Sequence, residues 1–271
     1  MRSRLLASGD GWDVADVICT SGPQDRPYDE RHAGYAMAIV LAGSFQYRSG
    51  LGRALMTPGS VMLANDRLCF ECGHEHGEGD RCVSFTYAPE YFERLAADAD
   101  VPGIREGFNV PRLPPTAALS LMTVRAGLGA SGSGDVAWDE LALRLAVSAM
   151  RLASGASPDS RPLPANAEAR VTRTVRRIDR HPDAISGLDA LAGEAGLSPY
   201  HFLRTFERVT GVTPHQYVQR ARLREAATRL RTNSGKVVDI ALDCGFGDIS
   251  NFNRAFRTEF GVSPRVFRSI P

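Results

Sequence analysis

The chain has 271 residues, of which 43% are hydrophobic, 23% charged and 8% aromatic, a composition typical of a globular protein with more than one core. Its formal charge of +1 hides an uneven distribution, because residues 1–166 carry −5 and residues 167–271 carry +6. The basic C-terminal part indicates a polyanionic partner. With no apolar span of about 20 residues and no secretory leader pattern, we expect a cytoplasmic protein without a membrane segment.

The N-terminal part reads as β structure followed by helices. Short apolar stretches separated by glycine and proline fill residues 35–87 and predict an antiparallel sandwich or small barrel. Two segments with helical periodicity, 116–128 and 136–152, flank a glycine-containing turn at 129–134 and predict an antiparallel helix pair. Such a pair serves either as a dimer surface or for local packing.

A stretch rich in serine, proline and alanine divides the chain. Residues 154–166 lack apolar periodicity and predict a linker between a module of residues 1–153 and a module of residues 167–271. The second module reads as helical throughout. Its helix starts are marked by an N-cap residue followed by proline at Ser198, Thr213 and Ser263.

The C-terminal module contains an internal repeat. At a shift of 50 residues, seven of thirteen positions match, among them Phe202 with Phe252 and Gly211 with Gly261. Upstream, a shift of 49 aligns Leu191-Ala192 with Ile240-Ala241. Each copy contains a short helix, a glycine turn and a second helix, which is the pattern of a helix-turn-helix unit.

The second helix of each copy is predicted to have one face buried in the core and the opposite face exposed to solvent. Apolar residues at helical spacing, such as Phe202 and Phe206, form the core face. The opposite face is expected to contact base edges and phosphates, since arginine pairs with guanine and asparagine with adenine. Its residues are Tyr200, Leu203, Arg204 and Arg208 in the first copy and Ser250, Asn253, Arg254 and Arg257 in the second.

One long segment, residues 213–233, joins the two copies. As a helix of about 20 residues it spans about 30 Å, close to the roughly 34 Å of one turn of B-DNA. A rigid connector of this length places two recognition helices in successive major grooves, so that one chain reads two half-sites. The alternative is a helical protein-binding adaptor that does not bind DNA and has an incidentally basic surface.

Residues 245–264, with Phe252, Arg254 and Phe256, closely resemble the signature of AraC/XylS-type transcription regulators, and residues 197–206 fit the same pattern. The resemblance covers residues 167–271 and implies a seven-helix domain with two helix-turn-helix units that binds a double-stranded DNA operator. It further implies a homodimer and RNA polymerase as partners. The family's base-proximal positions correspond to Tyr200, Leu203, Arg204, Ile249, Ser250, Asn253 and Arg254.

The N-terminal half resembles the cupin-type effector domain and dimerisation helices of such regulators. The fold class expected for the whole chain is therefore α+β: a cupin-like antiparallel β-barrel with an appended helix pair, followed by an all-α domain. The resemblance implies a small-molecule or metal effector. Gly52, Pro58, Gly59 and Asn65 echo one cupin motif, but no histidine stands between Gly59 and Asn65 to bind its metal. A metal-dependent cupin-type enzyme is the alternative; we expect no enzyme.

A cysteine and histidine cluster marks a candidate metal site. In an extended strand, Cys72, His74 and His76 share one face, and a five-residue loop at 77–81 would place Cys82 beside His76. These four side chains suit zinc or another thiophilic metal. A shorter loop instead sets Cys82 against Glu75. Two further readings stay open: a redox pair of Cys69 with Cys72 or Cys82, and small core cysteines beside surface histidines.

Overall fold

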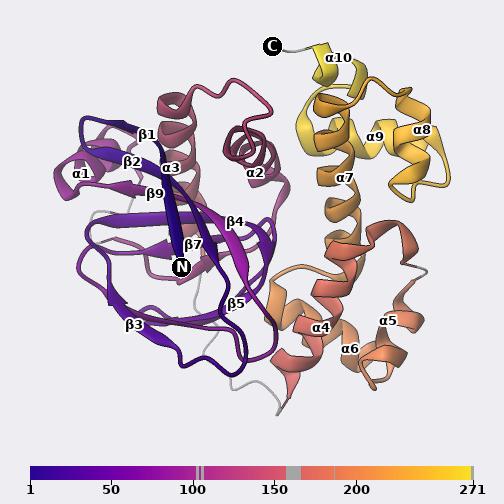
Figure 1. Cartoon of the computed structure of the whole chain (residues 1–271), viewed down its shortest axis with the longest axis horizontal. Helices are drawn as coiled ribbons and strands as arrows, with labels where there is room; N and C mark the ends of the chain where they lie inside the picture. The colour runs from indigo at the N-terminus through magenta and orange to yellow at the C-terminus, as the bar shows by residue number, and fades with distance from the viewer. Residues whose placement is uncertain (102–103, 105–106, 157–165, 186, 270–271) are drawn as a thin grey trace.

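The structure, a computed structural model, describes residues 1–101, 104, 107–156, 166–185 and 187–269. A β-rich N-terminal half packs against a helical C-terminal half, with one helix between them (Figure 1). This order of elements confirms the predicted α+β class with strands first and helices second.

The strands form two antiparallel sheets. They are β1 (Arg2–Gly9), β2 (Trp12–Cys19), β3 (Tyr28–Arg31), β4 (Tyr35–Gly43), β5 (Phe45–Ser49), β6 (Gly52–Met56), β7 (Val61–Ala64), β8 (Cys69–Gly73), β9 (Asp80–Tyr87) and β10 (Arg112–Leu113). One sheet has the order β1-β2-β9-β4-β7-β10 and the other has the order β3-β8-β5-β6. Apolar side chains of both sheets, including Met37, Ile39 and Tyr47, are fully buried.

The first three strands were not predicted; β3 pairs with β8, and β1 and β2 pair with each other. Strands β1 and β2 form a hairpin closed at Asp10-Gly11, where Gly11 has a φ of 88°. An Asp-Gly pair between two apolar stretches is a strong hairpin signal, since the tight turn needs positive φ. The prediction placed its first strand at residue 35 and missed this signal.

Helix α1 (Pro89–Asp98) follows β9, and helices α2 (Ala117–Ala130) and α3 (Trp138–Ser154) follow the last strand, β10. The last two confirm the predicted helix pair, whereas α1 was not predicted. Helix α2 contacts β4 and β9 on one side and two helices of the C-terminal half on the other. Because α2 is engaged within the chain on both sides, α3 offers the freer surface of the pair, where Leu143 is exposed.

The C-terminal half has seven α-helices among the described residues, as predicted. They are α4 (Ala167–Arg180), α5 (Leu188–Glu194), α6 (Pro199–Thr210), α7 (Pro214–Thr232), α8 (Val237–Asp243), α9 (Ile249–Phe260) and α10 (Pro264–Ser269), with a 3₁₀ turn η2 (Pro182–Ala184) after α4. The predicted linker, 154–166, falls largely on residues 157–165, which lie outside the described residues.

Side-chain caps explain why these helices start where they do. The hydroxyls of Ser198 and Thr213 accept from the backbone N–H groups three residues on, and Thr213 forms a full capping box with Gln216. Ser263 accepts from the N–H of Val266 at 3.4 Å. All three predicted helix starts are confirmed. The cap of α9, Asp248, was not predicted.

Each helix-turn-helix unit has a core of its own, and both cores include side chains from the N-terminal half. Leu55 of β6 joins the core that contains Phe202, Phe206 and Tyr217. On the other side, Val124 and Leu128 of α2 join the core that holds the phenylalanines of α9. The chain is therefore continuous in packing across the predicted domain boundary.

Candidate nucleic-acid interface and interdomain site

Helices α6 and α9 occupy equivalent places in the two helix-turn-helix units. Phe202 and Phe206 of α6 are fully buried, as are Phe252 and Phe256 of α9, so that each helix is anchored by two rings one turn apart. The side of each helix opposite these rings is left for contacts outside the chain.

The turns before α6 and α9 have the same geometry. Gly196 and Gly245 have φ values of 64° and 86°, a region that favours glycine because a Cβ would be strained there. In both turns the next residue donates its N–H to a helix carbonyl five residues back: Leu197 to Ala192 at 3.0 Å and Phe246 to Ala241 at 3.1 Å. The repeat detected in the sequence is therefore a repeat of backbone hydrogen bonds.

The predicted contact residues of α6 lie on its outer face. Tyr200 is 62% exposed and Arg204 is exposed. The Arg204 guanidinium donates to the Tyr200 hydroxyl at 3.0 Å and lies over its ring, 5.8 Å from the centroid. The hydrogen bond that Arg204 donates to Tyr200 raises the pKa of Arg204. Leu203 and Arg208 are half-buried, so Tyr200 and Arg204 dominate this face.

The corresponding face of α9 is more polar. Ser250, Asn253, Arg254 and Arg257 are exposed. Arg254 donates to the side-chain oxygen of Asn251, one turn back. Ile249 is different, because it is half-buried and packs against the core of its unit.

The connector between the two units is a single helix. Helix α7 has 19 residues, about 28 Å at 1.5 Å per residue. It carries α4, α5 and α6 at one end and α8, α9 and α10 at the other (Figure 1). The predicted rigid spacer at residues 213–233 is therefore a helix of nearly the expected length.

The N-terminal half is tied to both α6 and α9. The buried guanidinium of Arg112 donates to the carbonyl oxygens of Leu55 in β6, at 2.8 Å, and Val209 in α6, at 2.7 Å. Burial lowers the pKa of Arg112 to about 10. Glu259 of α9 accepts from the Ser120 hydroxyl of α2 and pairs with Arg220 of α7 at 3.2 Å.

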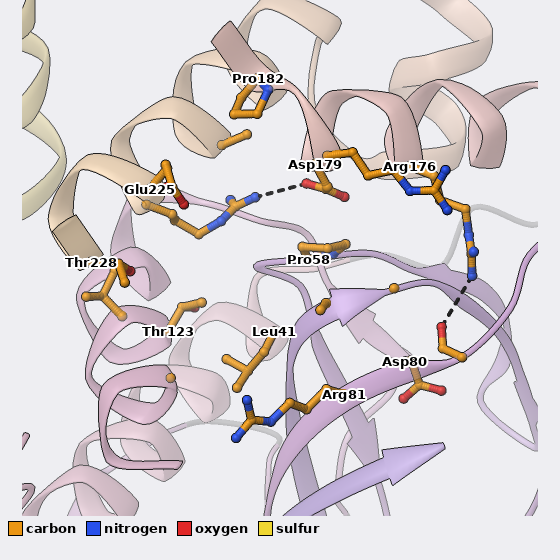
Figure 2. Close-up of a pocket in the computed structure, with 18 of the residues that line it drawn as sticks. Leu41, Pro58, Asp80, Arg81, Thr123, Arg176, Asp179, Pro182, Glu225 and Thr228 are labelled. Atoms are coloured by element: carbon orange, nitrogen blue, oxygen red, sulfur yellow. Dashed lines mark hydrogen bonds and ion pairs between the residues drawn. The ribbon is translucent and has the colours of Figure 1, made fainter. Parts of the chain in front are cut away.

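A cavity of about 610 Å³ lies where the two halves meet. In Figure 2, Arg176 and Asp179 of α4 face Asp80 and Arg81 of β9 across it. Asp179 pairs with Arg224 at 3.5 Å and accepts from the Tyr217 hydroxyl at 3.2 Å. Burial raises the pKa of Asp179 to about 7, although Arg224 and Tyr217 favour its charged form.

The hairpin on which the predicted metal site depends does not form. Strand β8 pairs with β3 and β5, whereas β9 pairs with β2 and β4, so that consecutive strands belong to different sheets. Cys72 therefore lies opposite Tyr47, and Cys82 lies opposite Val17 and Val40. Both predicted loop registers are wrong, because each assumed that neighbouring strands pair with each other.

The four predicted ligands are accordingly distributed over two places. His74 is buried, and its Nε2 lies 2.7 Å from Oδ2 of Asp80. Cys82 donates its thiol to Oδ1 of Asp80 at 3.3 Å, and burial raises the pKa of Cys82 well above its usual range. Cys72 is buried in the same core as Cys82. His76 instead lies beside Glu75 and Glu168.

Two possible metal ligands outside the predicted set, Cys19 and Asp80, converge on His74. Possible ligand atoms of Cys19, His74 and Asp80 all lie within 4.8 Å of one another. His32 is separate from them; it stacks on Phe70 at 4.0 Å and contacts the Tyr47 hydroxyl at 3.2 Å. Cys69 is exposed.

The C-terminal half is similar in sequence to known proteins. A family model described as a helix-turn-helix domain matches residues 191–270. The regulatory protein SoxS of Salmonella typhimurium is 37% identical over 91 residues, which are 34% of this chain and 85% of SoxS. The transcriptional activator RhaS of Escherichia fergusonii is 36% identical over 103 residues, and this match spans only 37% of its length.

Of two similar solved structures, one covers about a third of this chain and the other covers nearly all of it. The DNA-binding domain of AdpA, crystallised with a target DNA, is 28% identical, with 37% of this chain and 90% of that chain covered and a TM-score of 0.36. ToxT from Vibrio cholerae covers 96% of this chain and 97% of its own, at 14% identity and a TM-score of 0.37.

No helix in the described part of the chain is long and apolar enough to cross a membrane. The two named relatives are a transcriptional activator and a regulatory protein. With its two helix-turn-helix units and its match to nearly the whole of SoxS, the chain belongs to the AraC/XylS family of DNA-binding transcription regulators.

Proposed function

We propose that this regulator reads a double-stranded operator with the outer faces of α6 and α9, and that its N-terminal half senses a small molecule or a metal ion. The observation that carries the proposal is the exposure of Tyr200 and Arg204 on α6 and of Asn253 and Arg254 on α9, at equivalent sites of two units joined by one helix. Arginine and asparagine on such faces suit base edges, and Arg257 suits phosphate.

The direct contacts between the halves support a response to an effector. A ligand in the interdomain cavity would touch the sheet through Arg81, α4 through Arg176 and α7 through Arg224. Since α4 contacts α6, and α7 contacts both α6 and α9, occupancy of the cavity can change how these two helices are held. The cavity presents both arginines and carboxylates, which suits a polar ligand.

The partners follow from the same proposal. The regulator would act in the cytoplasm, where the chromosome lies, as a homodimer and beside RNA polymerase. Exposed Leu143 and Arg144 of α3 supply a surface for a second copy, since α2 is engaged within the chain.

The test is duplex binding by the full chain. A preferred duplex is first selected from a randomised pool, and its affinity is then measured by fluorescence anisotropy at several salt concentrations, with a scrambled duplex as control. We expect affinity that falls steeply with salt and favours the selected duplex. Equal, weak binding of both duplexes at every salt concentration would contradict the proposal and favour a protein-binding adaptor.

A further inference from the structure

We propose that Cys19, His74 and Asp80 form a site for one divalent cation of the zinc class. The site would supply the metal-sensing role proposed above. Ion binding itself does not depend on that proposal, whereas the effect of the ion on DNA binding does. Only His74 also belongs to the ligand set that the sequence spacing predicted. Strand pairing and sheet packing bring Cys19 and Asp80 to His74. The site lies at one end of the six-stranded sheet, beside the interdomain cavity.

Strand pairing explains how the three side chains meet. Cys19 ends β2, Asp80 begins β9, and these two residues lie directly opposite each other in the antiparallel pair. Side chains of directly opposite residues project to the same face of a sheet. His74 arrives from the other sheet, just after β8, and completes the group.

The geometry is close to that of an occupied site. The three ligand atoms lie within 4.8 Å of one another, whereas ligands of a tetrahedral zinc ion lie about 3–4 Å apart. Shifts of about 1 Å therefore suffice: Nε2 of His74 and Oδ2 of Asp80, hydrogen-bonded at 2.7 Å, separate slightly to take the ion in place of their shared proton, and the sulfur of Cys19 completes the set. The fourth position is left for water or another ligand.

The charges and the surroundings also fit. A thiolate, a carboxylate and a neutral imidazole together carry −2, which matches a divalent ion in a site where Cys19 and His74 are each 4% exposed. Cys82 donates to the second oxygen of Asp80 at 3.3 Å and so orients the carboxylate. Asp80 lines the interdomain cavity, which supplies a route by which an ion enters.

The site is placed to influence how the halves contact each other. His74 and Asp80 bracket a loop whose Glu78 and Gly79 carbonyls accept from Arg176 of α4, at 2.8 and 3.3 Å. A Cβ at Gly77 would lie 2.1 Å from the guanidinium carbon of Arg176, so the arginine lies directly on this loop. Drawing His74 and Asp80 onto an ion would move the carbonyls that Arg176 binds.

The first experiment measures the ion itself. The metal-free full chain is titrated with zinc against a chromophoric chelator, and cobalt is substituted to detect a sulfur-to-metal charge-transfer band. We expect one equivalent bound, the thiolate band present, and binding at least about 10-fold weaker in Cys19→Ser and His74→Gln. Cys69→Ser, which removes an exposed thiol, and His76→Gln should bind as the parent chain does.

Three results would overturn the site. These are no zinc bound by the parent chain, a cobalt complex without the thiolate band, or loss of binding in His76→Gln with Cys19→Ser unaffected. Thermal unfolding distinguishes a lost ligand from a misfolded variant. Zinc should raise the Tm of the parent chain and of Cys69→Ser, and leave that of a folded Cys19→Ser variant unchanged.

The regulatory consequence has its own measurement. Affinity for the selected duplex is compared with zinc and with a chelator, in the parent chain and in Arg176→Ala. We expect a change of about fivefold or more in the parent chain and a smaller change in the variant. Zinc binding without any change in duplex affinity would reject the coupling and leave the site standing. Zinc binding by a chain that binds no duplex would reject the proposed function alone.

Discussion

Single exposed arginines on the two recognition helices are held by neighbours on the same helix. Arg204 is positioned by the hydroxyl and ring of Tyr200, and Arg254 by the side chain of Asn251. Holding a long side chain in place before binding lowers the conformational entropy lost when it contacts a base. Both arginines would therefore lose little conformational entropy in the base contacts proposed for them.

Replacing either arginine should weaken specific binding. Arg204→Ala and Arg254→Ala are each expected to cost about 1–3 kcal/mol of affinity for the selected duplex, because each removes a paired contact to one base. Anisotropy titrations against the selected and scrambled duplexes measure this. Arg94→Ala, which removes an exposed arginine of α1 away from the proposed DNA and dimer surfaces, is the control and should bind normally. Unchanged affinity in both test variants would show that the contact face is wrongly assigned.

Asp179 should make stability depend on pH. Burial raises its pKa to about 7 from the usual 3.8 of an aspartate, so between about pH 4 and 7 the folded chain holds a proton that the unfolded chain has lost. Its contribution therefore favours folding at low pH and is lost as the pH rises through 7. The free energy of unfolding of the parent chain should fall by about 1–3 kcal/mol more than that of Asp179→Asn between pH 5 and 8. Urea titrations at several pH values test this, and parallel pH profiles would contradict the shift.

At the scale of elements, the helix-turn-helix units owe their shape to local sequence signals. Each recognition helix begins at a side-chain cap, Ser198 or Asp248, and follows a glycine with positive φ. Caps and glycine turns act within a few residues, because they satisfy backbone groups that a helix end leaves unpaired. The two units therefore repeat in sequence and in structure.

Removing one cap should destabilise its helix. Both carboxylate oxygens of Asp248 accept backbone N–H groups, from Ser250 and Asn251 at 3.0 Å each. Asp248→Ala should lower the free energy of unfolding by about 0.5–2 kcal/mol in urea titrations followed by circular dichroism. Asp243→Ala, which removes an exposed carboxylate, should change it by less than about 0.5 kcal/mol. Equal effects of the two changes would contradict a capping role.

At the scale of the whole molecule, neither half is packed independently of the other. Leu55 completes the core under α6, and Val124 and Leu128 complete the core under α9. Arg112 links β6 and α6 through two buried carbonyl oxygens. The N-terminal half therefore contacts both helix-turn-helix units directly.

The buried link through Arg112 should matter far more than an exposed one. Arg112→Met leaves the carbonyl oxygens of Leu55 and Val209 without this donor and should cost about 2–4 kcal/mol in urea titrations. Arg53 also bridges the halves, to Glu168 at 2.5 Å, but is 46% exposed. Arg53→Met should cost less than about 1 kcal/mol. A larger effect in Arg53→Met than in Arg112→Met would contradict this ranking of the two contacts.

Several features were predictable because their causes lie close together in the chain. The order of strands and helices, the helix pair after the sheets, the proline-marked helix starts and the repeat around Phe202 and Phe252 all depend on spacing within short segments. The hairpin at Gly11 carried a similar local signal that was overlooked. The operator contacts at α6 and α9 and the dimer stay predictions, supported by exposure.

The sequence by itself determined the family, the two helix-turn-helix units and the rigid helix between them, since caps, periodicity and repeat act over a few turns. Only the tertiary structure decided that β8 and β9 enter different sheets, that α2 lies between the halves and that Cys19 meets His74 and Asp80. The physical reason is that strand pairing and sheet packing join residues far apart in the chain, and spacing carries no record of which strands pair.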